Sequence, residues 1–275
     1  MGCGIQIQAV EQQKCHDILK IQLHIIKAGR FTGKYVNPAC LICERDEVLC
    51  NMRIKQPEII YEDEAVIVCR KEAGVAVQTA RAGQADMVSL LKNYRAKKKE
   101  EPYIGLIHRL DQPVEGVMVF AKTKKAAAKL SAQVRNRSME KEYLAVTAGV
   151  PQPEKGELCD WLLRDGKINT STVVAKGTPQ AKEAKLSYEV VEVREKAQTA
   201  LVHIWLHTGR HHQIRVQFAH AGYPLYGDTK YGTAENNAYC PVGLCSCRIA
   251  FLHPITEKEM VFTIEPKGKA FGISI

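Results

Sequence analysis

The sequence predicts an α+β protein with a mostly antiparallel sheet, and three observations support this fold class. Many short runs of β-branched and aromatic residues alternate with few helical patterns. The chain shows no internal repeat and no low-complexity segment, which excludes solenoid and fibrous folds. Its 275 residues, 45% of them hydrophobic, suffice for one large or two small domains with an ample core.

The first part of the chain differs from the rest. Residues 15–28 predict a short amphipathic helix that Gly29 ends. Pro57 follows a turn signal and marks a natural boundary. We therefore expect an N-terminal extension over residues 1–56 and a main domain over residues 57–275.

The main domain is expected to open with a β-hairpin, whose strands cover residues 59–61 and 65–69 around an acidic turn. Buried strands should flank the turn that carries His108 to Asp111. The remaining expected elements are a helix over 87–94, a charged loop over 95–101, strands over 104–107 and 117–121, a helix over 126–134, and strands over 143–147, 186–193 and 201–206.

The charge, apolar stretches and cysteine content of the chain limit the classes of function that it can have. There are 39 Lys and Arg against 30 Asp and Glu, a net charge of +9, which fits a polyanionic partner. No stretch has the apolar length needed to cross a bilayer, and no export signal opens the chain, so we expect a cytoplasmic protein without a membrane partner. The ten cysteines are dispersed, and only one CxxC pair, Cys40 and Cys43, is present. Reduced thiols are therefore expected rather than a zinc ribbon.

Basic charge concentrates between Lys122 and Lys141, where seven Lys or Arg accompany one acid, Glu140. Such a run is either a solvated helix face or a surface that contacts phosphates. The helical residues of this run are Lys124, Lys125, Lys129, Arg135 and Arg137.

Several catalytic motifs are missing. The chain has no GxGxxG, GxxxxGK[ST] or GxSxG pattern, so neither a nucleotide cofactor nor a hydrolase nucleophile is predicted. The histidines between His203 and His220 come without the spaced carboxylates or thiolates of a metal centre. We expect no cofactor and no metal.

Two segments carry reactive side chains. The turn His108-Arg109-Leu110-Asp111 places a carboxylate and a guanidinium between apolar strands. From its chemistry alone, Asp111 is more readily a turn cap than a working carboxylate. The second segment runs from Thr208 to Phe218 and brings Arg210 and Arg215 together; its plainest interpretation is a solvated basic helix.

Taken in order, six motifs resemble an RluA-type pseudouridine synthase over residues 57–266. Two departures are visible: Gln112-Pro-Val-Glu115 replaces a frequent Lys-Asp-Thr-Ser, and Cys245 stands where His is common. The motifs are Ile60-Tyr-Glu-Asp-Glu64, His108-Arg-Leu-Asp111, Lys141-Glu-Tyr-Leu-Ala145, Thr208-Gly-Arg-His-His-Gln-Ile-Arg215, Gly222-Tyr-Pro-Leu-Tyr-Gly-Asp228 and Leu244-Cys-Ser-Cys-Arg-Ile-Ala-Phe-Leu-His-Pro254.

The resemblance implies a pseudouridine synthase fold with a central RNA-binding cleft. It also implies an enzyme that breaks the uracil–ribose bond in rRNA or tRNA and rejoins the base through C5, without a cofactor. Asp111 would be the catalytic carboxylate, either as a nucleophile or as a base that gives a glycal. Arg215 would hold that carboxylate charged, and Tyr143 would lie against the uracil ring.

By the same resemblance, Arg109 would act as a wedge when the target base is flipped out. We place His108, Lys141, Arg210 and His212, together with the five helical cations, among the RNA-binding residues. The intact trio Asp111, Tyr143 and Arg215 argues against a catalytically dead RNA-binding protein on the same fold. We expect a monomer with no obligatory protein partner. Residues 1–56 are either a degenerate alpha-L RNA-binding module or an unrelated extension.

Overall fold

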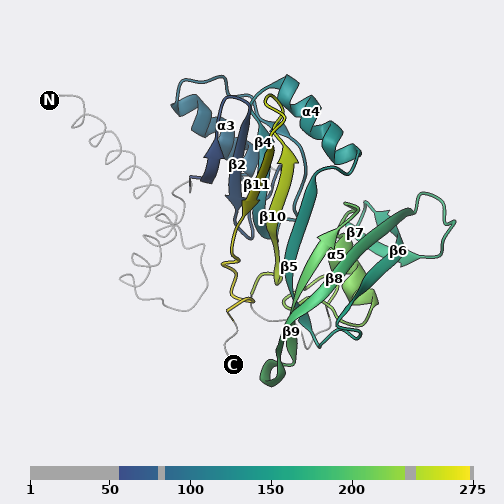
Figure 1. Cartoon of the computed structure of the whole chain (residues 1–275). Coiled ribbons are helices and arrows are strands. Elements are labelled where there is room, and N and C mark those ends of the chain that lie inside the picture. The colour runs from purple at the N-terminus through teal and green to yellow at the C-terminus, as the bar shows by residue number, and fades with distance from the viewer. Residues whose placement is uncertain (1–55, 80–83, 233–239, 273–275) are drawn as a thin grey trace, which may run out of the picture. The chain divides into compact units, whose positions relative to one another are not determined.

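The computed structural model of the chain describes residues 56–79, 84–232 and 240–272 (Figure 1). The expected helix over 15–28 lies outside these residues, as does the expected extension apart from Gln56. Across the described ranges, no helix has the length and apolar character needed to span a membrane.

One large sheet organises the described residues. Eleven strands are present, in the order β1-β2-β4-β10-β5-β9-β8-β6-β7, with β3 added to β4 and β11 to β10. The pair β4 and β10 is parallel, whereas the other pairings in this sheet are antiparallel. The strands are β1 Glu58–Glu62, β2 Val66–Lys71, β3 Gly105–Leu106, β4 Glu115–Ala121, β5 Glu140–Ala148, β6 Lys155–Asp165, β7 Thr170–Val174, β8 Lys182–Arg194, β9 Thr199–Leu206, β10 Leu244–Leu252 and β11 Glu259–Thr263.

Among the described residues, three α-helices cover the sheet: α3 Met87–Lys97, α4 Lys124–Arg135 and α5 Gln213–His220. A side chain caps the N-terminus of α3 and of α4. Asp86 accepts a hydrogen bond from the N–H of Ser89, and Thr123 accepts one from the N–H of Ala126. A short 3₁₀ helix, Glu195–Ala197, joins β8 to β9. The predicted class, α+β with a mostly antiparallel sheet, is therefore confirmed.

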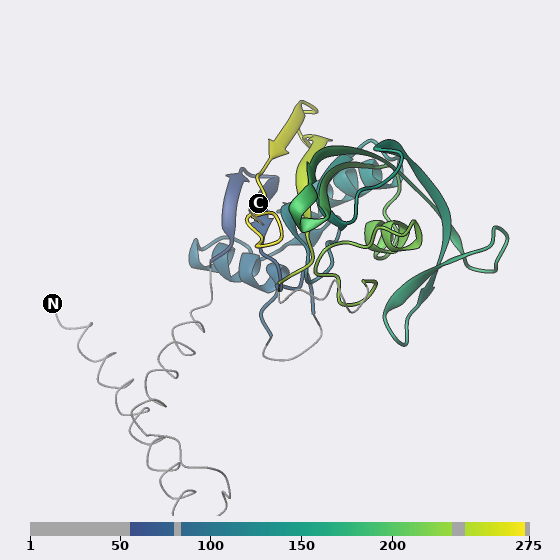
Figure 2. The ribbon, with the colours of Figure 1, turned by 90° about the horizontal axis from the view of Figure 1, so that it is seen from below.

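Helices α3 and α5 lie on one face of the sheet, and α4 lies on the other (Figure 2). Alternation along β2 shows this directly: Ile67 and Cys69 pack with α3 and α5, whereas Val66 and Val68 pack with α4. Because both faces are covered, all of β4 is buried, and after Glu115 its sequence is apolar without alternation.

Several predicted elements are confirmed and others needed correction. The hairpin over 59–61 and 65–69 forms as β1 and β2. The charged loop was placed too early, since α3 continues to Lys97 and buries Arg95, whose guanidinium donates to the carbonyl of Lys122. Strands β6, β7, β10 and β11 were not predicted. Much of β6 and β11 alternates exposed with half-buried residues and β6 carries several charges, whereas β10 is buried along nearly its whole length.

Gly116 permits the close approach of the parallel strands β4 and β10. It pairs with Ser246 at φ +154°, and a Cβ on it would lie 2.5 Å from the Cβ of Ser246 and 2.7 Å from its nitrogen. Ser246 in turn pairs with Tyr143 on β5. The spacing of three central strands therefore depends on the absence of a side chain at Gly116.

We predict that Gly116→Ala lowers the free energy of unfolding by about 2 kcal/mol or more, because backbone atoms of β10 cannot yield to the added methyl. Urea denaturation measures the change. Gly166→Ala is the matched control, since a Cβ there meets no atom within 4 Å. Equal stability of the two variants would show that β10 can shift to accept the methyl.

Candidate active site

Asp111 lies on a tight turn between β3 and β4. The N–H of Val114 donates to the carbonyl of Asp111 at 3.1 Å, and Leu110 and Val114 are buried on either side. The Asp111 side chain keeps 25% of its surface exposed. Within the described ranges, no backbone N–H donates to its carboxylate, so the turn-cap interpretation is wrong. The carboxylate instead faces Arg215.

A fully buried lysine supports this turn from β2. The ammonium of Lys71 donates to the carbonyls of Glu72, Gln112 and Val114 at 3.1, 3.0 and 2.6 Å. Burial lowers the pKa of Lys71 to about 7, although the negative charges of Asp111 and Glu115 oppose this shift. Two of the three carbonyls, those of Gln112 and Val114, closely follow Asp111 in the chain, so Lys71 fixes the path of the turn that carries the carboxylate.

Helix α5 is buried rather than solvated, which corrects the plainest interpretation of its sequence. Its polar residues find partners inside the fold. Gln213 accepts from the hydroxyl of Thr208 and donates to Gln217, which in turn donates to the carboxylate of Asp160 on β6 at 2.7 Å. These buried amides bind α5 to β6 and β8, and they orient the residue between them, Arg215.

Arg215 joins two carboxylates. Its Nε and Nη2 donate to Asp228 at 2.7 Å each, and its Nη1 donates to Oδ2 of Asp111 at 3.2 Å. The Arg215 side chain is 5% exposed and that of Asp228 is fully buried. The ring of Tyr231 lies 5.2 Å from the guanidinium carbon. The guanidinium is thus held by a bidentate pair on one edge and offers the other edge to Asp111.

The charges of this pair stabilise each other. Burial raises the pKa of Asp228, but the hydrogen bonds and charge of Arg215 and the N–H groups of Lys230 and Tyr231 outweigh burial and lower it. Burial likewise opposes the charge of Arg215, yet Asp228 and Asp111 raise its pKa. Both groups are charged at neutral pH, so Asp111 faces a permanent cation.

Two histidines stand at the start of α5. His212 takes a left-handed conformation, with φ 52°, and its Nε2 lies 3.7 Å from Oδ2 of Asp111. Its Nδ1 is 2.7 Å from the hydroxyl of Tyr231. The ring of His211 stacks on it with centroids 3.7 Å apart. Burial and the charge of Arg215 lower the pKa of His212 to about 3, so its ring is neutral at neutral pH.

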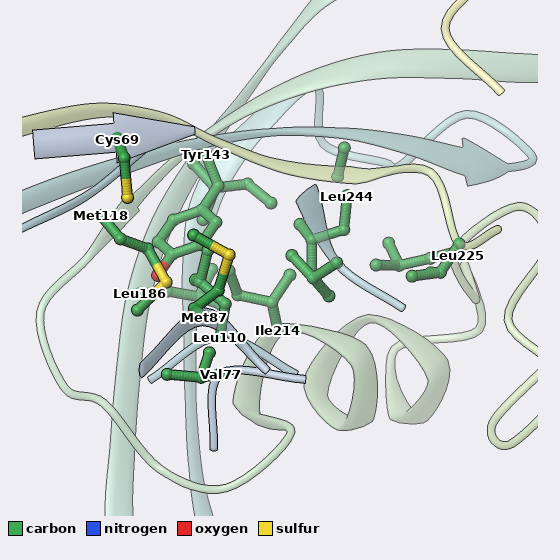
Figure 3. Close-up of a cluster of buried hydrophobic side chains, with 14 of the residues drawn as sticks. Cys69, Val77, Met87, Leu110, Met118, Tyr143, Leu186, Ile214, Leu225 and Leu244 are labelled. Atoms are coloured by element: carbon green, nitrogen blue, oxygen red, sulfur yellow. The ribbon is translucent and has the colours of Figure 1, made fainter. Parts of the chain in front are cut away.

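Tyr143 projects from β5 into the main core cluster, where its ring lies among side chains from several elements (Figure 3). Leu110 and Ile214 belong to the same cluster, and each is the sequence neighbour of a site residue, Asp111 or Arg215. The ring is 5% exposed. Burial raises the pKa of Tyr143, and the charge of Asp111 adds to this, so its phenol stays protonated.

The residues expected to bind RNA fall into different surroundings. Arg109 is exposed beside Asp111 and, within the described part of the chain, has no hydrogen bond or ion pair. Lys141 is half-buried with its ammonium against Gly209, and burial lowers its pKa. Arg210 donates from Nε to the carbonyl of Glu183 at 2.8 Å. His108 is buried, with Nε2 accepting from the N–H of Val119 at 3.3 Å, and burial lowers its pKa to about 3.

The cations of α4 lie on the face of the sheet opposite Tyr143. Lys129 pairs there with Glu257 at 3.2 Å, and Lys122 is buried against Glu62 at 2.7 Å. The structure therefore does not bring these cations together with Asp111. The others on this face are Lys124, Lys125 and Arg135, with Arg137 just beyond the end of the helix.

Sequence reasoning missed three residues of the site: Lys71, Asp228 and Tyr231. Asp228 was visible as a carboxylate that closes a Gly-Tyr-Pro-Leu-Tyr-Gly run, and Lys71 as a charge at the end of an apolar strand. Neither signal predicts which residue the side chain contacts, because Asp228 binds Arg215 and Lys71 binds Gln112, and neither contact is local in the sequence.

A carboxylate held by a buried guanidinium, near an aromatic ring and surrounded by cations, suits an enzyme that acts on a nucleoside within a polyanion. The comparisons agree. Residues 65–220 match the family model described as RNA pseudouridylate synthase. The chain therefore belongs to the RNA pseudouridylate synthase family, in its RluA-type branch, and is an RNA pseudouridine synthase.

The chain is similar to the ribosomal large subunit pseudouridine synthase D of Pseudomonas aeruginosa, with 39% identity over 221 residues, which cover 75% of this chain and 67% of the relative. It is also similar to an uncharacterized RNA pseudouridine synthase of Aquifex aeolicus, with 34% identity over 221 residues, 75% of this chain and 68% of the relative. The solved structure of human RNA pseudouridylate synthase domain containing 4 shares the fold, with a TM-score of 0.65 and 24% identity over 81% of this chain and 93% of the human chain.

We predict that Asp228→Asn lowers the free energy of unfolding by about 3 kcal/mol at pH 7, because it leaves Arg215 buried without its main counter-ion. The pKa of Asp228 is lowered in the folded protein, so its contribution is present above the unfolded value, 3.8, and is lost as pH falls through the folded value. The difference between wild type and variant should therefore shrink below about pH 4.

Urea denaturation from pH 3 to pH 8 measures this difference. Glu189→Gln is the control, since it breaks only the exposed pair with Lys155 and should change stability little at any pH. A loss in Asp228→Asn that does not change with pH would mean that packing, not charge, holds Arg215.

Proposed function

We propose that Asp111 is the catalytic carboxylate of this enzyme. The supporting observation is its ion pair with Arg215, whose Nη1 lies 3.2 Å from Oδ2 of Asp111, while a quarter of the Asp111 side chain stays open to solvent. A carboxylate in this state can attack C1′ of the target uridine as the glycosidic bond breaks, or can remove the C2′ proton to give a glycal. In both routes the C1′–N1 bond breaks, and the freed uracil turns and rejoins C1′ through its C5.

The target base reaches Asp111 by leaving its helix or loop, in this proposal. Tyr143, on the same face of the sheet as Leu110 and Ile214, offers an aromatic ring whose phenol stays protonated. This ring replaces the stacking that the flipped base loses. Arg109 is the exposed cation next to Asp111, and it fills the gap left in the RNA. All these residues come from one chain, so the proposed site needs no group from a second subunit.

Cations near His211 support the RNA path. Arg164, Lys230 and Arg109 are close enough to that ring to lower its pKa together with burial, and Arg164 stands on the β6–β7 hairpin. We propose that phosphates near the target contact this group together with Lys141 and Arg210. The cations of α4, on the opposite face, would meet only RNA that is remote from the target uridine.

The relatives named as ribosomal large subunit synthases make rRNA the first RNA to test, with tRNA as the alternative.

We predict that Asp111→Asn folds and binds RNA but loses pseudouridine formation by at least about 1,000-fold, because the amide keeps the shape without the reactive charge. Pseudouridine mapping of total RNA incubated with each protein measures this. Asp165→Asn, the same change in the turn of the β6–β7 hairpin, is the control and should retain activity. Activity of Asp111→Asn within a few-fold of wild type would remove Asp111 from the chemistry.

We predict that Arg109→Ala impairs turnover of a structured stem-loop far more than of an RNA whose target uridine cannot pair. A wedge supplies part of the few kcal/mol needed to unpair and unstack the base, and that cost shrinks in the loosened RNA. Single-turnover rates on both RNAs measure the effect. Lys196→Ala, in the 3₁₀ helix between β8 and β9, is the control. Equal losses on the two RNAs would reject the wedge and make Arg109 an electrostatic partner of Asp111.

A further inference from the structure

Tyr231 places its hydroxyl between the β6–β7 hairpin and the start of α5. The hydroxyl oxygen lies 2.9 Å from the backbone nitrogen of Ser171 and 2.7 Å from Nδ1 of His212. A backbone N–H can only donate, so the oxygen accepts that bond and keeps its own proton for another partner. In the part of the chain that the structure describes, the acceptor within reach is Nδ1 of His212.

The direction of this hydrogen bond decides which nitrogen of His212 carries the proton. A neutral imidazole has a single N–H, so a Tyr231 hydroxyl that donates to Nδ1 places the proton on Nε2. Nε2 faces Oδ2 of Asp111 at 3.7 Å, and a carboxylate can only accept. The same oxygen receives Nη1 of Arg215 at 3.2 Å. Both donors thus point at Oδ2, and in the described residues no hydrogen bond goes to Oδ1.

We propose that His212 is a positioning residue which, oriented by Tyr231, holds Oδ2 of Asp111 and leaves Oδ1 as the reacting oxygen. This inference rests on the proposed role of Asp111. The separation of 3.7 Å exceeds a hydrogen bond, and the contact closes when RNA fills the site, as is common for catalytic groups. His212 was expected to bind RNA, but its buried ring faces the carboxylate.

The reacting oxygen then acts in one of two ways. In the nucleophilic route, Oδ1 gives an electron pair to C1′ while the C1′–N1 bond breaks and its electron pair leaves on uracil. In the glycal route, Oδ1 takes the C2′ proton, the C2′–H pair forms a C1′–C2′ double bond, and the C1′–N1 pair again leaves on uracil. His212 neither gains nor loses a proton in either route, so it holds the carboxylate throughout.

The β6–β7 hairpin fixes the plane of the His212 ring as well as its tautomer. His211 stacks on that ring, and its two nitrogens bond Oγ of Ser171 at 2.9 Å and Oδ1 of Asn169 at 3.1 Å. Ser171 therefore supports His212 in two ways. Its N–H donates to the Tyr231 hydroxyl that bonds His212, and its hydroxyl bonds the His211 ring that stacks on His212. The hairpin is in this way a rigid support for the carboxylate, although it supplies no group that touches it.

Nitrogen NMR of the RNA-free, ¹⁵N-histidine-labelled protein tests the tautomer without any need for activity. The wild type should show His212 neutral, with the proton on Nε2. Tyr231→Phe should lose this fixed tautomer, whereas Tyr226→Phe should keep it, because the Tyr226 hydroxyl makes no hydrogen bond with the described residues. A proton on Nδ1 in the wild type would overturn the proposal.

A double-mutant cycle then tests the effect on catalysis. Tyr231→Phe should lower the single-turnover rate by about 10-fold or more, with KM for RNA unchanged, because the carboxylate is misplaced rather than the RNA lost. His212→Gln keeps an N–H donor near the position of Nε2 and has no tautomer, so adding Tyr231→Phe to it should cost less than about 2-fold. His212→Met has similar length and no donor, and it should be slower than His212→Gln.

Equal losses from Tyr231→Phe in both backgrounds, or equal rates for the Gln and Met variants, would reduce Tyr231 and His212 to packing and overturn the proposal. If the wild type forms no pseudouridine in any RNA, the proposed function fails, and the ring tautomer still decides whether Tyr231 orients His212. The two failures are therefore distinguishable.

Discussion

The ion pair of Arg215 and Asp228 is the constraint on which the site depends. Both groups are buried, and a buried charge without its partner costs several kcal/mol, so the fold must bring α5 and the loop after it together whenever it forms. The pair also leaves one edge of the guanidinium free, and that edge meets Asp111. The carboxylate of Asp111, which we propose as the catalytic group, is thus aligned by an ion pair whose strongest part, between Arg215 and Asp228, lies outside the proposed reacting groups.

The sheet supplies the second constraint. The parallel pair of β4 and β10 brings Gly116 against Ser246, and Ser246 lies opposite Tyr143 on β5. The turn before β4 carries Asp111 and is held from β2 by the ammonium of Lys71. Carboxylate and aromatic ring are therefore placed by the same few strands, which is the rigid support that a site with fixed geometry requires.

The two faces of this sheet carry different groups of residues. The face with α3 and α5 carries Tyr143 and the partners of Asp111, whereas the face with α4 closes a second core around residues such as Val119. The alternation of side chains along β4 separates the two. The basic helix α4 follows the Asp111 turn in sequence and consequently lies across the sheet from it. Arg164 of the β6–β7 hairpin, far along the chain, instead comes to lie near His211.

The sequence by itself determined the fold class, the hairpin of β1 and β2, the two helices α3 and α4, and the family, because apolar periodicity and ordered motifs are local properties. It also singled out Asp111, Tyr143 and Arg215, though only through that resemblance. Tertiary structure alone decided that Asp111 is no turn cap, that α5 is buried, and that Asp228, Lys71 and Tyr231 belong to the site. The physical reason is that an ion pair, a hydrogen bond or a tautomer is a property of two groups, and these partners are separated by up to 104 residues.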